Sequence, residues 1–186
     1  MDKATKKQIG IIAAVLVAVL ALLQSRFSES TKTFEVSSPA KAKVLYSQDV
    51  NINKELIPLI ENADRFAFFA VYTFTRTDIR DALIAAKKRG IEVRGITDRS
   101  QFENLATQRS LIKALREAGI DVVTQDHLGI MHLKLLVTDK AYASGSYNWT
   151  SSATNLNDEI IEIGNEETLR SAYERIFLEL WEKYAK

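Results

Sequence analysis

The sequence predicts an α/β fold in which a mixed β-sheet is sandwiched by helices. After residue 41, short apolar runs rich in β-branched residues alternate with segments of helical pattern, which is typical of α/β sandwiches. Residues 131–144 contain two such runs with only a short connection between them. They predict an antiparallel hairpin, and therefore a sheet that is not purely parallel. About 145 residues of folded chain suit a single domain.

Each predicted element has a local reason. The run Arg65 to Phe74 is apolar on both faces, as expected of a strand in a sheet that is covered on each side. Thr77 is suited to begin a helix, and Gly90 and Gly119 are suited to end one. Strands are expected over residues 43–47, 65–74, 92–97, 120–124, 131–137, 141–144 and 159–164, and helices over 53–62, 77–89, 105–118 and 166–184.

The run HLKLLVTD carries the residues that point to chemistry. Side chains two apart on a strand share a face, so His132 and Lys134 are expected to point out together. Leu133, Leu135 and Val137 then fall on the opposite face, where they would form a core layer. This pattern places the reactive groups on one face of the strand and the packing groups on the other.

An imidazole and an ammonium at this spacing favour attack on a phosphodiester. A neutral imidazole is a competent nucleophile when an acceptor holds its other ring nitrogen and stabilises the cation that forms. Glu159 is the expected acceptor for His132. Lys134 would stabilise the negative charge on the non-bridging phosphate oxygens.

Three further polar residues complete the predicted site. Ser146 and Asn148 are expected to bind the substrate by donating hydrogen bonds to the same phosphate oxygens. Asp139 stands at the far end of the predicted strand. It belongs to the motif, but its place favours an ion-pair or turn partner over a reacting group.

These spacings resemble those of the phospholipase D superfamily. The sequence is similar to its one-motif kind, above all to small bacterial endonucleases with the pattern HxKxxxxD followed by GSxN. The matching positions are His132, Lys134 and Asp139, then residues 145–148, and the resemblance spans about residues 40 to 186. Five residues separate Asp139 from Gly145, where the family pattern often has six.

The resemblance implies a two-step transfer. One histidine attacks phosphorus to give a phosphohistidine, and a second protonates the leaving oxygen and then activates water. Since the motif supplies one His132 per chain, the resemblance implies a symmetric homodimer in which two copies of His132 face each other. His127, in a predicted loop, is the other histidine of the chain and the alternative to dimerisation.

Composition excludes several other classes of site. The chain has no cysteine and two histidines, so thiolate metal sites, disulfides and a three-histidine zinc centre are excluded. No nucleotide-binding, zincin or serine-hydrolase motif occurs. We therefore expect metal-independent chemistry with no cofactor. The competing hypothesis is a two-metal nuclease built on Asp98, Asp139, Asp158 and Glu159.

The first residues predict export. Residues 9–23 form an apolar run of fifteen, preceded by Lys3, Lys6 and Lys7, which is typical of an export signal. Fifteen is short for a membrane span but normal for a signal. Residues 1–24 are therefore a signal peptide or a signal anchor that would associate with a membrane, 25–40 a tether, and 41–186 the catalytic domain, placed in the periplasm or outside the cell.

Charge and aromatic residues bear on the substrate. Residues 1–30 hold four basic and two acidic side chains. The rest of the chain therefore has 21 basic and 22 acidic side chains, a net charge of −1. If the folded domain binds nucleic acid, its positive charges must therefore be concentrated in the binding cleft. Tyr72 and Phe74 are expected to pack in the core. For Trp149, core or interface packing is expected, with base stacking as the alternative.

Three functions follow from these observations. The leading hypothesis is a non-specific nuclease that hydrolyses DNA, with RNA as a further substrate. The alternative is hydrolysis of lipid phosphodiesters at the membrane, and a non-catalytic binding domain is the third. The intact set of reactive residues argues against the last, because a binding surface needs no nucleophile.

Overall fold

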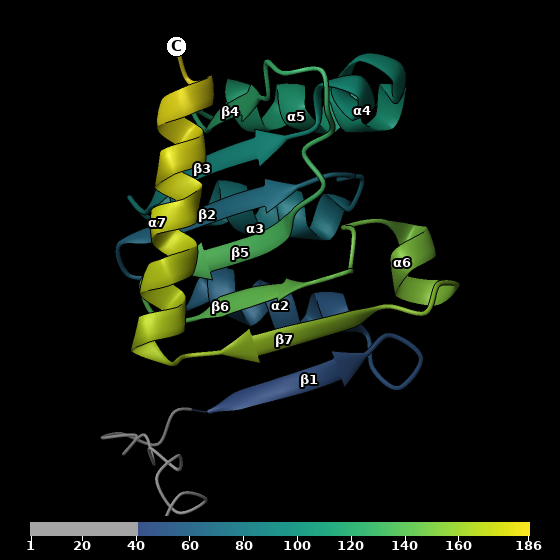
Figure 1. The fold of residues 1–186 in the computed structure, drawn as a ribbon, viewed down its shortest axis with the longest axis vertical. Coiled ribbons are helices and arrows are strands. Elements are labelled where there is room, and N and C mark those ends of the chain that lie inside the picture. Colours follow the sequence, from purple (N-terminus) through teal and green to yellow (C-terminus); the bar gives the residue numbers. More distant parts are fainter. Residues whose placement is uncertain (1–40) are drawn as a thin grey trace, which may run out of the picture. The chain divides into compact units, whose positions relative to one another are not determined.

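The computed structural model describes residues 41–186, which form one seven-stranded sheet with helices on both faces (Figure 1). The strands are β1 (Ala42–Tyr46), β2 (Phe66–Val71), β3 (Glu92–Thr97), β4 (Asp121–Thr124), β5 (Lys134–Thr138), β6 (Tyr142–Gly145) and β7 (Ile160–Gly164). The helices are α2 (Ile52–Glu61), α3 (Thr77–Lys88), α4 (Arg99–Asn104), α5 (Ala106–Glu117), α6 (Ser151–Asn155) and α7 (Glu167–Tyr184).

The sheet is mixed, as predicted. Its strand order is β1-β7-β6-β5-β2-β3-β4. The β2, β3 and β4 strands are parallel, whereas β5 pairs antiparallel with both β2 and β6, and β7 pairs antiparallel with β6 and β1. The predicted hairpin is the β5–β6 pair, and it brings the HLKLLVTD segment to the centre of the sheet.

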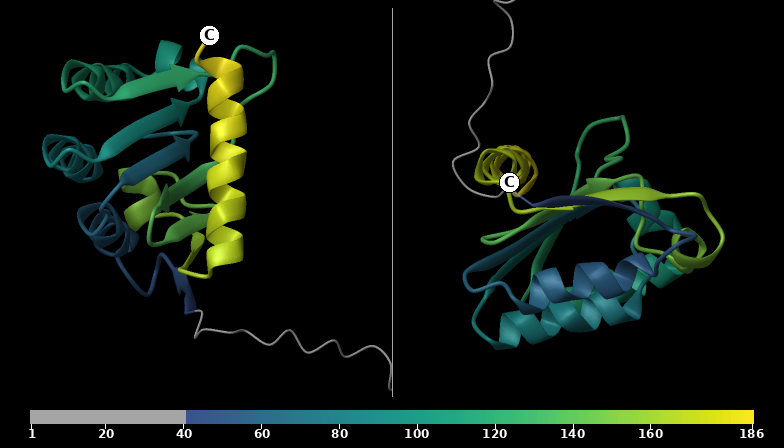
Figure 2. Two further views of the ribbon diagram at one scale, coloured as in Figure 1. Left: turned by 90° about the vertical axis from the view of Figure 1, so that its left-hand side faces the viewer. Right: turned by 90° about the horizontal axis from the view of Figure 1, so that it is seen from below.

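Two hydrophobic layers cover the two faces of the sheet. Helices α2, α3 and α5 pack on one face, and α7 crosses the other (Figure 2). Neighbouring residues of β2 alternate between them: Phe69 belongs to the larger layer, and Phe68 stacks on Phe177 of α7 at 4.9 Å between ring centroids. This double burial explains why the β2 run is apolar without interruption.

Most predicted elements are confirmed, and the differences lie next to the strand ends. The predicted strand 65–74 ends at Val71, after which the chain leaves the sheet. The structure adds two short helices, α4 and α6, that were not predicted. The side chains of Asp98 and Thr150 cap their first turns by accepting hydrogen bonds from backbone N–H groups.

The predicted leader and tether, residues 1–24 and 25–40, lie outside the described residues. Within residues 41–186, none of the helices combines the length and apolar character needed to cross a membrane. The export hypothesis thus rests on the sequence of residues 1–24 alone.

Candidate active site

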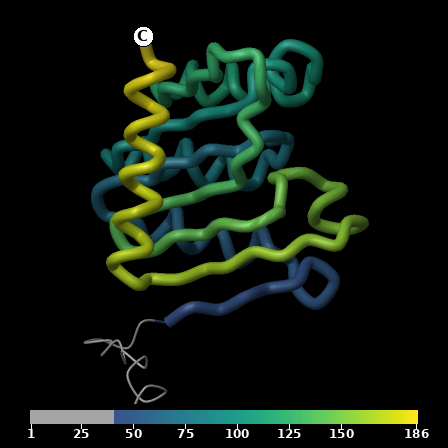
Figure 3. Tube along the Cα trace, in the orientation of Figure 1, coloured from purple at the N-terminus to yellow at the C-terminus, as the bar shows by residue number. Residues whose placement is uncertain are grey.

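A pocket of about 560 Å³ lies where β5, β6 and β7 meet the segments that precede or follow them. Figure 3 shows the long β4–β5 connection running past the strand ends before the chain enters β5. The pocket is lined by His132, Lys134, Gly145, Ser146, Asn148, Glu159 and Ile160. Five of the six predicted site residues are therefore brought together, and Asp139 is not.

His132 lies in the connection and not in the strand. The predicted strand from Met131 was wrong at its beginning, because β5 starts at Lys134. Leu133, predicted to be in the core, is 39% exposed. Its carbonyl oxygen still accepts from the N–H of Tyr72 at 2.9 Å, so the backbone is held to the segment that follows β2. His132 is exposed and lines the pocket, which suits a nucleophile that must meet a substrate.

Lys134 is buried, with 6% of its surface exposed. Its Nζ donates a hydrogen bond of 2.9 Å to the carbonyl oxygen of His132. Burial lowers the pKa of Lys134, and the nearby Glu159 carboxylate partly opposes that shift. A desolvated ammonium provides a strong local charge for a phosphate oxygen, and the nearby carboxylate favours its charged form.

Glu159 and Ser146 bind each other in the structure. The hydroxyl of Ser146 donates to the carboxylate of Glu159, which also accepts from Asn157 Nδ2 at 3.1 Å. The expected hydrogen bond between Glu159 and His132 is not among those within residues 41–186. The hydroxyl of Ser146 therefore holds this carboxylate in place, and its expected hydrogen bond to a phosphate oxygen stays a prediction.

Gly145 permits this arrangement because β6 and β7 approach closely. A Cβ atom at position 145 would lie 2.2 Å from the carbonyl oxygen of Ile160 and 2.8 Å from the Cα of Ile161. The N–H of Ser146 donates to the same Ile160 oxygen at 3.0 Å. A side chain at Gly145 would therefore displace the Ser146 and Glu159 pair.

Asn148 is oriented by the segment after β2. Its Oδ1 accepts from the N–H of Thr73 at 3.2 Å, so the amide NH₂ group remains as the donor for a ligand. The neighbouring Trp149 is 1% exposed and packs against Phe69 and Phe74. Core packing is confirmed for Trp149 and Phe74, and the base-stacking alternative for Trp149 was wrong.

Asp139 lies at the opposite end of β5 from Lys134. Its Oδ1 accepts from the N–H of Asp64 at 3.1 Å, and its Oδ2 lies 3.8 Å from Arg65 Nε. This placement matches the ion-pair or turn role and removes Asp139 from the reacting groups, because the whole of β5 separates it from the pocket.

The acidic residues of the competing hypothesis are scattered. Asp98 is buried as a helix cap, and the carboxylate of Asp158 accepts from the hydroxyl of Tyr46. In the part of the chain that the structure describes, no three His or acidic side chains are grouped so that they could hold a metal ion. The two-metal hypothesis therefore lacks its ligand cluster.

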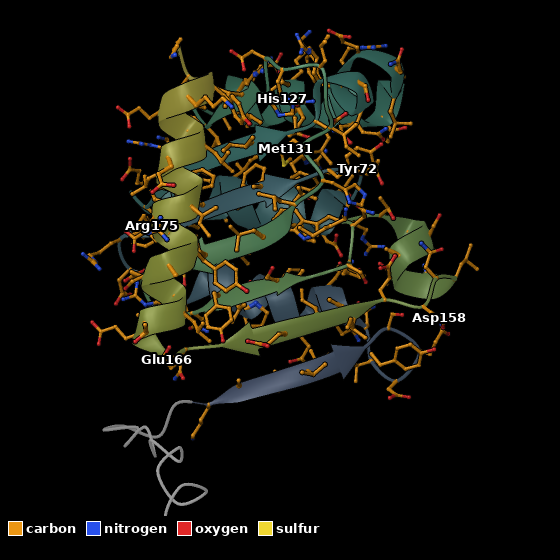
Figure 4. The ribbon with its side chains drawn as sticks, in the orientation of Figure 1. Tyr72, His127, Met131, Asp158, Glu166 and Arg175 are labelled. Atoms are coloured by element: carbon orange, nitrogen blue, oxygen red, sulfur yellow. The ribbon has the colours of Figure 1, made fainter. Side chains whose placement is uncertain are left out.

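His127 lies in the β4–β5 connection and is not among the lining residues of the pocket. Its carbonyl oxygen accepts from Arg99 at 2.8 Å, and its ring lies 6.0 Å from that of Tyr184. Figure 4 shows His127 near the upper end of the sheet, whereas Tyr72 lies lower, near the strand ends. His127 is thus a structural loop residue in a single chain.

Sequence reasoning missed a supporting group of residues around the pocket. Tyr72, expected in the core, is half-buried, and its ring contacts both His132 and Lys134. Asp98 accepts hydrogen bonds from the N–H groups of Gln101 and Met131, the latter directly before His132. An Asp that follows a buried strand and precedes a helix signals a cap, but its link to Met131 depends on the fold.

An exposed imidazole beside a buried ammonium, at the centre of this mixed sheet, is the arrangement that the phosphodiesterase class requires. Comparisons agree with this class. Residues 56–181 match the family described as "Cardiolipin synthase, PLD-like domain". The fold also matches the Nuc protein of Salmonella typhimurium, a phospholipase D family member, with a TM-score of 0.72 and 26% identity over 78% of this chain and 96% of that one.

Two curated proteins are similar to this chain in sequence. The chain is 35% identical to a mitochondrial cardiolipin hydrolase of Xenopus tropicalis, over 69% of this chain and 60% of that protein. It is 30% identical to a phospholipase D of Rickettsia conorii, over 76% of this chain and 71% of that protein. The chain spans only 60 to 63% of the length of the cardiolipin hydrolases that it matches first. It belongs to the phospholipase D superfamily, in the group with a single HxKxxxxD motif.

Proposed function

We propose that this protein hydrolyses phosphodiester bonds of nucleic acid without a metal ion, through a phosphohistidine at His132. The observation that carries the proposal is the pocket itself, which unites an exposed imidazole with a buried ammonium at Lys134 and an oriented amide at Asn148. Each group matches a need of phosphoryl transfer: a nucleophile, a charge for the non-bridging oxygens, and a directional donor.

The reaction has two steps. A ring nitrogen of His132 attacks phosphorus, the bond to the leaving oxygen breaks, and that oxygen takes a proton from a second histidine. The second histidine then removes a proton from water, whose oxygen attacks phosphorus and releases His132. Lys134 and Asn148 hold the non-bridging oxygens throughout, and Glu159 supports the charged form of Lys134.

The second histidine comes from a second copy of the chain in this proposal. His127 is absent from the pocket lining, and the chain has no third histidine. Because His132 is exposed, it can approach its counterpart across a twofold axis. The proposal therefore includes a homodimer with His132 of each copy near the axis.

Lipid hydrolysis is the second function that specific observations favour. Curated relatives at 35% and 30% identity are named a cardiolipin hydrolase and a phospholipase D. Apolar side chains also border the pocket: Ile160 is 56% exposed and Leu133, next to His132, is 39% exposed. Such groups are suited to contact acyl chains. Nucleic acid stays the leading substrate of the proposal because the fold matches that of Nuc.

The two substrates are separated by one assay. The full chain would be incubated with plasmid DNA, single-stranded DNA, RNA and cardiolipin vesicles, each with excess chelator, beside a His132→Ala control. Cleavage of nucleic acid that resists chelation and is lost in the control is the expected result. Cleavage of lipid alone would replace the nuclease proposal with the lipid one.

The covalent step and the dimer have tests of their own. A quench at alkaline pH during turnover, followed by mass spectrometry, should find the substrate phosphoryl group on His132. Light scattering should give twice the mass of the chain, and a solitary chain with full activity would contradict the shared site. We further propose that residues 1–24 direct export, which fractionation of expressing cells would test.

A further inference from the structure

Tyr72 touches both reactive groups of the pocket. Its ring centroid lies 4.8 Å from that of His132, with an angle of 63° between the planes, and 5.1 Å from the Nζ atom of Lys134. Aromatic rings attract one another in such edge contacts, and the face of a tyrosine ring attracts an ammonium. One side chain thus restrains the imidazole and the cation together.

Helix α4 holds the Tyr72 ring in place through Gln101. The Nε2 atom of Gln101 donates to the hydroxyl of Tyr72 at 3.1 Å, and its Oε1 accepts from the hydroxyl of Thr73 at 3.2 Å. The backbone N–H of Gln101 donates to the buried Asp98 carboxylate at 2.9 Å. The tyrosine is therefore fixed at both the ring and the hydroxyl end.

The backbone around Tyr72 supports the same pocket. The N–H of Tyr72 donates to Leu133, between His132 and Lys134, and the N–H of Thr73 donates to Asn148. The other titratable side chain that lines the pocket is Glu159, whose carboxylate is held by Ser146 and Asn157. Tyr72 is the side chain that joins the nucleophile to the phosphate-binding lysine.

We propose that Tyr72 is a positioning residue, whose ring sets the imidazole of His132 and the ammonium of Lys134 in the relative geometry that in-line attack requires. This inference rests on the proposed phosphohistidine reaction. The need is strict, because a misplacement of about 1 Å can slow an enzyme by a factor of about 100. An aliphatic side chain offers neither a ring edge to an imidazole nor a polar face to an ammonium.

The test compares two substitutions of the full chain. Tyr72→Leu removes the ring, whereas Tyr72→Phe keeps the ring and removes only the hydroxyl bonded to Gln101. Tyr173→Leu is the matched control, because Tyr173 is also half-buried and packs on an aromatic ring, that of Tyr142, away from the pocket. The substrate is bis(4-nitrophenyl) phosphate, a diester that belongs to neither biological class.

We expect Tyr72→Leu to lower kcat by a factor of about 10 to 100 with little change in KM, since positioning acts on the reacting step. Tyr72→Phe should retain most of kcat, and Tyr173→Leu should match the wild type. Equal losses in the Leu and Phe variants, or a Leu variant with wild-type kcat, would overturn the positioning role. If the Leu variant fails to fold, Tyr72→Met, which also removes the ring, replaces it, with the same loss of kcat expected and an unchanged kcat contradicting the proposal.

A spectroscopic measurement needs no substrate. The chain has two histidines, so their ring proton signals can be assigned with a His127→Ala variant. The His132 signals should move on Tyr72→Leu and stay nearly unchanged on Tyr72→Phe, because the ring current of Tyr72 acts on them. Unmoved signals would overturn the contact. An inactive wild type with moved signals would instead overturn the proposed function.

Discussion

Removal of the Asp98 carboxylate should destabilise the domain far more than an average surface change. Asp98 is fully buried and accepts from Ser100 Oγ at 2.7 Å, Gln101 N at 2.9 Å, Gln125 Nε2 at 2.8 Å and Met131 N at 3.0 Å. These four bonds join the start of α4 to the end of β4 and to the residue before His132.

The magnitude follows from the groups that Asp98→Ala leaves without a partner. Loss of the helix cap costs about 1 kcal/mol. An unpaired buried N–H at Met131 costs about 1 to 3 kcal/mol, and loss of the charged bond to Gln125 adds about 1.5 to 3 kcal/mol. The total is about 3.5 to 7 kcal/mol, which lowers the melting temperature of a domain of this size by about 10 to 20 °C.

The assay is urea unfolding followed by circular dichroism, with Asp121→Ala as control, since Asp121 is an exposed acid at the start of β4. The control should stay within about 0.5 kcal/mol of the wild type. Equal midpoints for the two variants would refute the reasoning. Activity should fall with the Asp98 variant as well, because Met131 positions the backbone next to His132.

The stabilisation by the Asp98 carboxylate should depend on pH. Burial alone would raise the pKa of Asp98, but hydrogen bonds from Ser100, Gln101, Met131 and Gln125 outweigh it and hold that pKa below the usual value of 3.8. The stability from ionised Asp98 is therefore present above the pKa of the unfolded chain and is lost as pH falls through the lower pKa of the folded state. The difference between wild type and Asp98→Asn should shrink below about pH 4.

Three further predictions concern the pocket. His132→Ala should abolish turnover while circular dichroism and dimer mass stay unchanged; wild-type-like activity would remove the mechanism. Glu159→Gln should shift the alkaline limb of the pH–rate profile to lower pH, because Glu159 supports the charged form of Lys134, whose pKa burial lowers; an unmoved or upward-shifted limb would contradict this role. Gly145→Ala should destabilise by about 1 to 3 kcal/mol in urea, since its Cβ meets backbone atoms of Ile160 that cannot turn aside; an unchanged midpoint would show that β6 and β7 can separate at no cost.

Much of the fold was predictable because its signals are local. The apolar runs of β2 and β3, the helical pattern of α3 and α5, and the short β5–β6 connection each appear within a few residues of sequence. Helices α4 and α6 were missed because they are only six and five residues long and too short to show a period. Their caps, Asp98 and Thr150, are the one local signal for them.

The site was predictable in its members and less so in its contacts. The motif spacing identified His132, Lys134, Ser146, Asn148 and Glu159 as pocket residues, and all five line the pocket. The expected pairing of Glu159 with His132 is replaced by bonds to Ser146 and Asn157. Only the register of β6 against β7 decides that pairing, and register is a property of the assembled sheet.

By itself, the amino-acid sequence determined the reactive groups of this protein, the alternation of strands and helices, and the superfamily to which it belongs, since these depend on residue types at short spacing. The tertiary structure alone decided that Tyr72 stands against His132 and Lys134 and that Asp98 holds Met131. Those partners are separated by 33 to 62 residues along the chain. Contacts over such distances arise only when the sheet orders its strands, and no local preference encodes them.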